Sequence, residues 1–179
     1  GVHSDCGTLT DAVEHPYFRD KNNIELISDS ISNDHAFIYV SNGTLYGFGY
    51  NQDYHLGFDS SGDYICEPTP VMYDFKSKLI MIKCSYTHSL FLTDNGNVYG
   101  CGSNKYGQLT SKYQDNNRIN NDGKLVYYYS IMKLDMFKNI KCITCSTHAS
   151  MVLDNNGIIY TFGKNNDGEL GVEPKTISH

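Results

Sequence analysis

The 179-residue chain has no tryptophan, only four prolines and only two arginines, Arg19 and Arg118. Charged residues make up 19% of the chain, and 20 acidic against 14 basic side chains give a formal net charge of −6. Because the lysines are scattered and form no positive stripe that could neutralise phosphates, the composition argues against direct binding of nucleic acid.

Long apolar runs are also missing. No stretch reaches the ~18 consecutive apolar residues that span a bilayer, and the first ten residues lack the basic and apolar regions of a secretory leader. We therefore expect a soluble, unprocessed chain without membrane contact. In a chain of this length, the six cysteines are expected to be reduced thiols packed as small apolar groups, which favours a cytoplasmic or nuclear location.

What the chain does contain is an internal repeat. The same pattern begins at Gly43, at Gly96 and at Gly157, so that the copies lie 53 and then 61 residues apart. Leucines near the end of each copy keep the same two intervals, which places a single insertion after Leu109 in the longer one. The pattern therefore predicts three similar structural units.

Each copy predicts a β-hairpin. Asn-Gly pairs at 42–43, 95–96 and 156–157 lie between β-rich runs, and this dipeptide favours tight hairpin turns because both residues tolerate positive φ. The expected hairpin strands are 36–40, 89–93 and 150–154 before the turns and 44–49, 97–102 and 158–163 after them. A further strand is expected ahead of each hairpin, at 24–31, 79–84 and 140–145. A weaker fourth strand is expected at 16–18, 70–73 and 131–134. Proline at the start of two of these fourth strands predicts an edge position. The pattern is typical of an all-β β-propeller segment with about three four-stranded antiparallel blades.

The repeat divides the chain into units. We expect the tail of a preceding repeat at 1–10, a first blade at 11–57, a second at 58–110 and a third at 111–171, with an inserted loop at 111–126 and a C-terminal extension at 172–179. Both ends of the chain match the ends of repeats, so we expect it to be part of a longer array.

The residues that recur at fixed spacing have structural roles that require no activity. Glycines suit sharp turns, asparagines can hydrogen-bond the backbone of a turn, tyrosines can pack between blades with the hydroxyl on a polar partner, and leucines hold the returning loop. This repeat scaffold comprises Gly43, Tyr46, Gly49, Asn51, Leu56, His35, His88, Gly96, Tyr99, Gly102, Asn104, Gly107, Leu109, Gly157, Tyr160, Gly163, Asn165, Gly168 and Leu170.

The run Gly102-Ser103-Asn104-Lys105-Tyr106-Gly107-Gln108-Leu109, with Thr87-His88-Ser89 and Val98-Tyr99-Gly100-Cys101 before it, resembles the repeat of the regulator of chromosome condensation family. The resemblance covers residues 7–171 and implies a seven-bladed ring, of which this chain would hold about three blades. Three blades would leave two apolar faces open, so we expect self-association through them or limited stability of the isolated chain. The chain is a divergent member, since Phe48, Cys101 and Phe162 stand where the family's repeat has tryptophan.

Two groups of side chains contain residue types found in catalytic or metal sites. Cys142, Cys145 and His148 have a spacing that fits zinc, but strand alternation puts the two cysteines on opposite faces, and a structural zinc site needs four converging ligands. His35 and His88 recur at the same place in their copies, which favours a scaffold role over catalysis. We therefore predict no metal, no cofactor, no catalytic residue and no enzyme activity.

The insertion at 111–126, polar and rich in asparagine, is the one segment that the repeat does not explain. One interpretation is a solvated surface excursion without function. The other is a partner-binding loop in which Tyr113, Arg118, Tyr127 and Tyr128 contact a protein, because tyrosine and arginine are enriched at interface hot spots.

Two functions remain open at this point. The first is a protein–protein interaction module without catalytic residues, which fits a resemblance confined to scaffold positions. The second is implied by the family resemblance alone: a guanine-nucleotide exchange factor, or part of one, for a Ran-type small GTPase. Such an exchange factor holds the nucleotide-free GTPase more tightly than the loaded form.

Overall fold

A computed structural model describes residues 11–20, 23–30, 34–60, 62–109 and 127–173. All regular structure in these ranges is β, and no helix in the described part of the chain is long and apolar enough to cross a membrane. The strands are β1 (Ile24–Ile27), β2 (Asp29–Ser30), β3 (His35–Val40), β4 (Leu45–Tyr50), β5 (Tyr64–Val71), β6 (Leu79–Cys84), β7 (His88–Thr93), β8 (Val98–Ser103), β9 (Tyr127–Lys133), β10 (Ile140–Cys145), β11 (Ala149–Asp154) and β12 (Ile159–Gly163).

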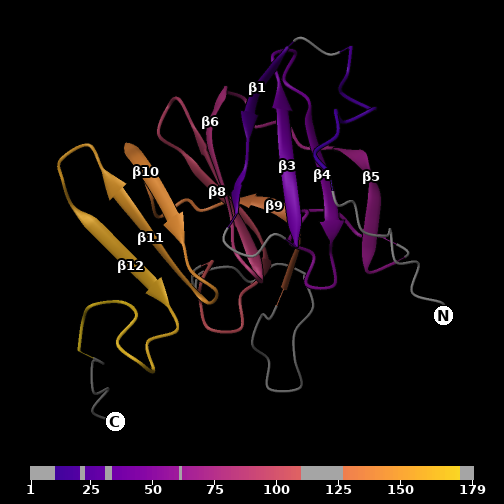
Figure 1. The fold of residues 1–179 in the computed structure, drawn as a ribbon. Helices are drawn as coiled ribbons and strands as arrows, with labels where there is room; N and C mark the ends of the chain where they lie inside the picture. Colours follow the sequence, from indigo (N-terminus) through magenta and orange to yellow (C-terminus); the bar gives the residue numbers. More distant parts are fainter. Residues whose placement is uncertain (1–10, 21–22, 31–33, 61, 110–126, 174–179) are drawn as a thin grey trace.

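The strands form three sheets that lie side by side in chain order, from the indigo sheet to the yellow one (Figure 1). The strand orders are β1-β3-β4-β5 for the first blade, β2-β6-β7-β8-β9 for the second and β10-β11-β12 for the third. All pairs are antiparallel except the two-residue pair β2–β6. The all-β fold of antiparallel blades predicted from the repeat is confirmed.

The three Asn-Gly turns join the central strands of the blades, as predicted. Gly43, Gly96 and Gly157 have φ of +88°, +76° and +86°, and their backbone N–H groups close the turns onto Val40, Thr93 and Asp154. The turns fix the register of β3–β4, β7–β8 and β11–β12, so that the three hairpins carry equivalent residues at equivalent places.

The fourth strand differs from the prediction in its sheet partner. β5 pairs with β4 through Leu45↔Val71 and Tyr46↔Pro70, so it completes the blade before it rather than beginning the next. β9 completes the second blade in the same way by pairing with β8. The chain leaving β4 or β8 turns back onto the adjacent open edge, the nearest site for a further strand. Both strands lie at sheet edges, and in β5 this position tolerates Pro70, from which an edge strand was predicted.

The predicted strand at 16–18 is wrong. These residues form a turn in which the Phe18 N–H donates to the His15 carbonyl at 3.1 Å. Phe18 is nonetheless buried, because its ring packs with Ile38 and Val40 on the outer face of the first blade. That apolar face, which was expected to be open, is largely covered by the chain's own preceding segment.

The hydrophobic core lies between the blades rather than within them. One cluster joins Phe37 and Leu56 of the first blade to Phe91 and Leu79 of the second. A second cluster joins the second blade to the third and includes Leu90, Leu92, Leu109, Ile143, Val152 and Phe137. Each sheet therefore depends on its neighbour to bury its apolar face.

The outer face of the third blade is exposed. Ile159 is 59% exposed and Met151 is 37% exposed, and β12 is the last strand of its sheet among the described residues. Self-association through this face stays a prediction. For the face of the first blade, Phe18 removes the reason to expect it.

Candidate functional site

The functional candidates gather at one end of the blades, opposite the Asn-Gly turns. At this end β4 and β8 finish, β6 turns into β7, β10 turns into β11, and the loops 51–57, 104–109 and 164–171 return. We call this the loop end. Since loops on a rigid propeller vary without disturbing the core, this is where binding residues are expected.

Each return loop is built in the same way. The side-chain oxygen of an asparagine accepts the backbone N–H of the leucine five residues later, in the pairs Asn51–Leu56 at 2.9 Å, Asn104–Leu109 at 2.7 Å and Asn165–Leu170 at 3.1 Å. The turn-forming role predicted for these asparagines is confirmed.

The glycine that precedes each loop is required by close approach of two backbones. Gly49, Gly102 and Gly163 have φ of +105°, +101° and +116°. A Cβ at these positions would lie 2.4–2.6 Å from the carbonyl oxygen of the residue before the hairpin's first strand. Because no L side chain fits there, these glycines fix the geometry from which the loops start.

The repeated tyrosines differ in their contacts. Tyr99 is buried and donates its hydroxyl to the Phe75 carbonyl at 3.1 Å, as predicted for a tyrosine between blades. Tyr46 packs edge-on against Tyr17 and Phe18, whereas Tyr160 is 41% exposed.

A second set of tyrosines, which sequence reasoning missed, lines the loop end. Tyr64 is 48% exposed, Tyr86 52%, Tyr106 39% and Tyr129 36%. They come from the start of β5, the β6–β7 turn, the loop after β8 and the start of β9. The sequence does distinguish these tyrosines from the scaffold, because none of them occupies a position that is tyrosine in all three copies.

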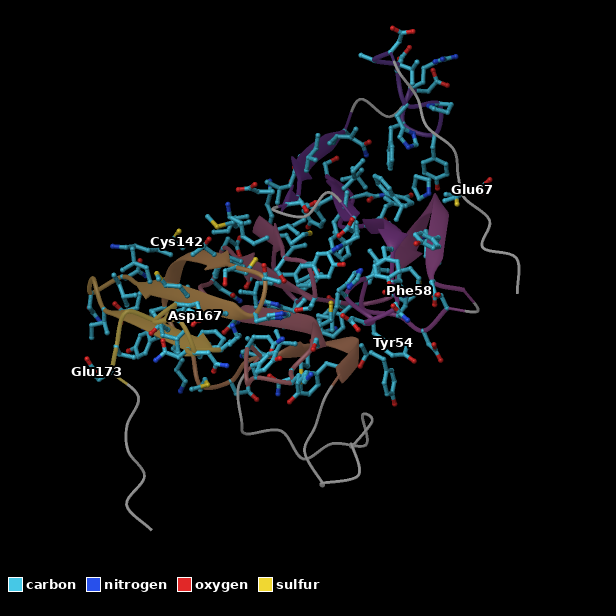
Figure 2. All side chains as sticks on the ribbon, turned by 60° about the horizontal axis from the view of Figure 1, so that its bottom comes forward. Tyr54, Phe58, Glu67, Cys142, Asp167 and Glu173 are labelled. Atoms are coloured by element: carbon cyan, nitrogen blue, oxygen red, sulfur yellow. The ribbon has the colours of Figure 1, made fainter. Side chains whose placement is uncertain are left out.

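Tyr54 extends this set on the first blade. It has φ of +59°, in the left-handed region that glycine favours, whereas the equivalent residues Gly107 and Gly168 have φ of +78° and +82°. Its ring lies 6.2 Å from that of Tyr129, which belongs to the second blade. Figure 2 shows Tyr54 and Phe58 on the side of the first blade, away from Asp167 of the third. A tyrosine kept in a strained backbone conformation is a reason to look for a role.

Charges of both signs accompany the tyrosines. Burial raises the pKa of the Tyr50 hydroxyl, and the carboxylates of Asp53 and Asp63 raise it further. On the neighbouring loop, the Lys105 ammonium lies 5.4 Å from the centre of the Tyr106 ring. The loop end is therefore aromatic, with acidic groups on the first blade and a lysine on the second.

The inserted loop contributes little that can be described. Tyr113 and Arg118 lie outside the described residues, and of Tyr127 only its place at the start of β9 is described. Tyr128 is fully buried in the cluster with Leu90 and Leu109, so the expectation that it contacts a partner is corrected. Its position in a paired strand turns the ring into the core instead of toward solvent.

The cysteines do not form the site considered above. Cys142 is exposed and Cys145 half-buried, and no cluster of three or more metal-ligating side chains occurs in the described ranges. Burial raises the pKa of the Cys84 thiol to about 12. Cys66 is disulfide-bonded, so the expectation of six reduced thiols is wrong.

The fold and its loop end define a segment of a β-propeller, whose blades pack face to face and present their loops at one end. The family model for the regulator of chromosome condensation (RCC1) repeat matches residues 42–92, and a second model for the same repeat matches 82–108. The chain therefore contains RCC1 repeats over residues 42–108.

Among its relatives, the chain is 29% identical over 147 residues to the X-linked retinitis pigmentosa GTPase regulator of Mus musculus, covering 82% of this chain and 14% of the relative. It is also 29% identical over 139 residues to the human RCC1-like G exchanging factor-like protein, covering 72% of this chain and 29% of the relative. The chain thus spans less than a third of the length of these relatives.

Solved structures show the same fold. Yeast RCC1 (Prp20) in its complex with Kap60 superposes with a TM-score of 0.76 at 20% identity, over 90% of this chain and 38% of the other. Human WBSCR16 superposes with a TM-score of 0.68 at 24% identity, over 86% and 39%.

Proposed function

We propose that this chain is a protein-binding part of a β-propeller and that its partners contact the loop end. The observation that carries the proposal is the row of half-exposed tyrosines across two blades, Tyr64, Tyr86, Tyr106 and Tyr129. Tyrosine offers a large, amphipathic contact area at a small loss of conformational freedom, which is why binding surfaces are rich in it. The proposed role is binding, with no catalytic step.

The charge of this surface narrows the class of partner. Asp53 and Asp63 lie close enough to Tyr50 to raise the pKa of its hydroxyl, and the chain as a whole carries −6. A partner that presents basic side chains around an apolar centre would meet complementary charge at the first blade. We therefore expect binding to weaken as salt concentration rises.

The proposal is tested by removing two of these rings. The double variant Tyr86→Ala and Tyr106→Ala should weaken binding at least about tenfold, since truncation of an interface tyrosine commonly removes more than about 1 kcal/mol. Proteins that co-purify with the wild-type chain would first be identified by mass spectrometry. Their dissociation constants for both forms would then be measured by calorimetry with purified proteins.

The matched control is Met72→Ala. Met72 is 92% exposed and follows β5 at the opposite end of the first blade. The control should leave the dissociation constant unchanged. Equal affinities for the wild type and the double tyrosine variant would refute binding at the loop end.

A second binding element is proposed in the inserted loop at 111–126, which starts from the same end as the tyrosines. Deletion of residues 112–126 tests the role of Tyr113 and Arg118. If the deleted form keeps every partner at wild-type affinity, the loop is a solvated excursion.

Guanine-nucleotide exchange on a Ran-type GTPase is the second candidate function. It is favoured by similarity to a relative that is itself named an exchanging-factor-like protein. Release of a fluorescent guanine nucleotide from the GTPase, with and without the chain, measures it directly. An unchanged release rate at saturating chain concentration would count against exchange while leaving the binding proposal intact.

A further inference from the structure

Two buried hydrogen bonds join consecutive blades through a histidine and a serine. His35 Nε2 lies 2.8 Å from Ser89 Oγ, and His88 Nε2 lies 2.8 Å from Ser150 Oγ. All four residues are at most 3% exposed. We call these contacts the first bridge (His35–Ser89) and the second bridge (His88–Ser150). Each crosses from one blade to the next.

The direction of the protons in each bridge follows from its second hydrogen bond. Ser89 Oγ lies 2.7 Å from the His55 carbonyl oxygen, and Ser150 Oγ lies 2.8 Å from that of Gln108. A carbonyl can only accept, so each serine gives its single proton to the carbonyl. The serine oxygen must then accept from the histidine, which places the imidazole proton on Nε2 in both bridges.

The other ring nitrogen of His88 also has a fixed role. Ser85 Oγ lies 2.7 Å from His88 Nδ1 and already accepts the backbone N–H groups of Thr87, at 3.2 Å, and His88, at 3.0 Å. The Ser85 hydroxyl also lies 2.9 Å from the His88 carbonyl oxygen, so its single proton goes either to that carbonyl or to Nδ1. A second proton on Nδ1 would face an oxygen whose two lone pairs are in use. The site accommodates a neutral imidazole.

The groups around the bridges make a charged ring still less favourable. The His55 ring stacks on His35 with centroids 4.1 Å apart, and the Phe37 ring packs edge-on with His35 with centroids 5.9 Å apart. The titratable groups that act on His35 are His55 and His88, and those that act on His88 are His148 and His55. His148 in turn lies near Lys164, Lys105, Asp53 and Glu169. Protonation of one imidazole therefore opposes protonation of the next.

In the described ranges, the two bridges lie at the two interfaces between consecutive blades. The first blade has His35 followed by Ala36, the second has His88 followed by Ser89, and the third has Ala149 followed by Ser150. Ala36 and Ala149 therefore remove the serine from the outer face of the first blade and the histidine from that of the third. Among the described residues, the bridges therefore couple the three blades to one another.

We propose that the two bridges are an acid-sensitive coupling, in which neutral imidazoles hold consecutive blades together near neutral pH and protonation releases them. The consequence for stability has a definite sign. Burial lowers the pKa of His88 to about 3 and that of His55 to about 4, while His35 also falls well below the ordinary value of 6.5. The stability contributed by the neutral rings is complete above about pH 6.5 and is lost as the pH falls.

The size of the effect follows from proton linkage. Each histidine that is neutral in the folded chain and charged in the unfolded chain raises the equilibrium constant of unfolding as the pH falls. The rise is up to about tenfold per pH unit. Three such rings give up to about a thousandfold per unit between roughly pH 6 and pH 4, in addition to the effect of the carboxylates.

The test compares the 179-residue chain with His88→Gln. Glutamine keeps an N–H donor near the place of Nε2 and does not titrate. The equilibrium constant of unfolding would be measured from pH 4.5 to 7.5 by urea unfolding followed by circular dichroism. Its pH dependence should be shallower for the variant than for the wild type, by about tenfold per pH unit. His15→Gln, at an exposed imidazole, should keep the wild-type slope. Equal slopes for wild type and His88→Gln would overturn the proposal.

A measurement on the wild type alone guards against a variant that fails to fold. Long-range ¹H–¹⁵N correlation spectra report the tautomer and charge of each imidazole. The proposal requires His35 and His88 to carry their proton on Nε2 and to stay neutral at pH 5.5 while the chain is folded. A proton on Nδ1, or a charged ring in the folded chain at that pH, would overturn it.

Discussion

The second and third blades carry the same hairpin in two different surroundings. Leu90 and Val98 of the second blade are fully buried, while the equivalent residues of the third, Met151 and Ile159, are 37% and 59% exposed. The hairpin registers agree, since Leu90 pairs with Gly100 and Met151 with Thr161. The difference comes from the third sheet, which covers the second, whereas no described sheet covers the third.

This comparison shows that local pairing and burial are separate properties in this fold. Turn chemistry and the strand pattern form each hairpin, but the neighbouring sheet supplies most of the free energy from apolar burial. A substitution should therefore cost much more in the second blade than at the matching place in the third. Three pairs of variants test this, from the largest expected effect to the smallest.

Truncation of the loop leucine gives the largest contrast. Leu109 is fully buried between the blades and Leu170 is half-buried. Leu109→Ala should lower the free energy of unfolding by about 2–5 kcal/mol, the usual result of a cavity in a packed core. Leu170→Ala should lower it by no more than about 1 kcal/mol, because the exposed site can adjust or fill with water. Urea unfolding measures both, and equal losses would contradict the comparison.

Exchange of a strand residue between the copies gives the next contrast. A Cβ at Gly100 would lie 2.5 Å from Leu109 Cδ2 and 3.2 Å from the Ser89 carbonyl, whereas the third blade accommodates Thr161 at this place. Gly100→Thr should destabilise the chain by about 1–3 kcal/mol through overpacking. Thr161→Gly should cost only about 0.5–1 kcal/mol, through the flexibility of glycine. Thermal melting compares the pair, and a harmless Gly100→Thr would show that the interface is loosely packed.

The asparagine that closes each loop gives the smallest contrast. Asn104→Ala leaves the buried Leu109 N–H without its acceptor and should cost about 1–2 kcal/mol. Asn165→Ala should cost about 0.5 kcal/mol, because water can reach the Leu170 N–H. Amide hydrogen exchange at residues 109 and 170 reads the two losses separately. Faster exchange at 170 alone would reverse the predicted order.

Much of the scaffold could be predicted from the sequence, because it depends on local chemistry. The Asn-Gly turns, the strands around them and the asparagine-closed loops each rest on neighbours within a few residues. The sheet partner of β5 could not be predicted, since periodicity does not say which of two adjacent edges a strand joins. The burial of Phe18 and Tyr128 was missed for a similar reason, because it depends on packing between distant segments.

The candidate site was less accessible to sequence reasoning. The insertion is visible in the sequence because it interrupts the repeat. The loop-end tyrosines lie inside the repeat and differ from copy to copy without changing its length. The bridges were missed because His35 and Ser89 are 54 residues apart and His88 and Ser150 are 62 apart. These separations exceed the repeat intervals of 53 and 61 by one. The histidine of one copy therefore faces the serine that comes one residue after the equivalent position in the next copy.

The strands β5 and β9 each complete one blade before the chain enters the next, so the unit of sequence and the unit of structure are out of step. A duplicated genetic segment covering one repeat would bring the closing strand of the blade before it and the first three strands of a new one. Its insertion would create no unpaired strand at the junction. A protein of this design can therefore gain or lose a blade in a single recombination event, because every strand at the junction still has a pairing partner.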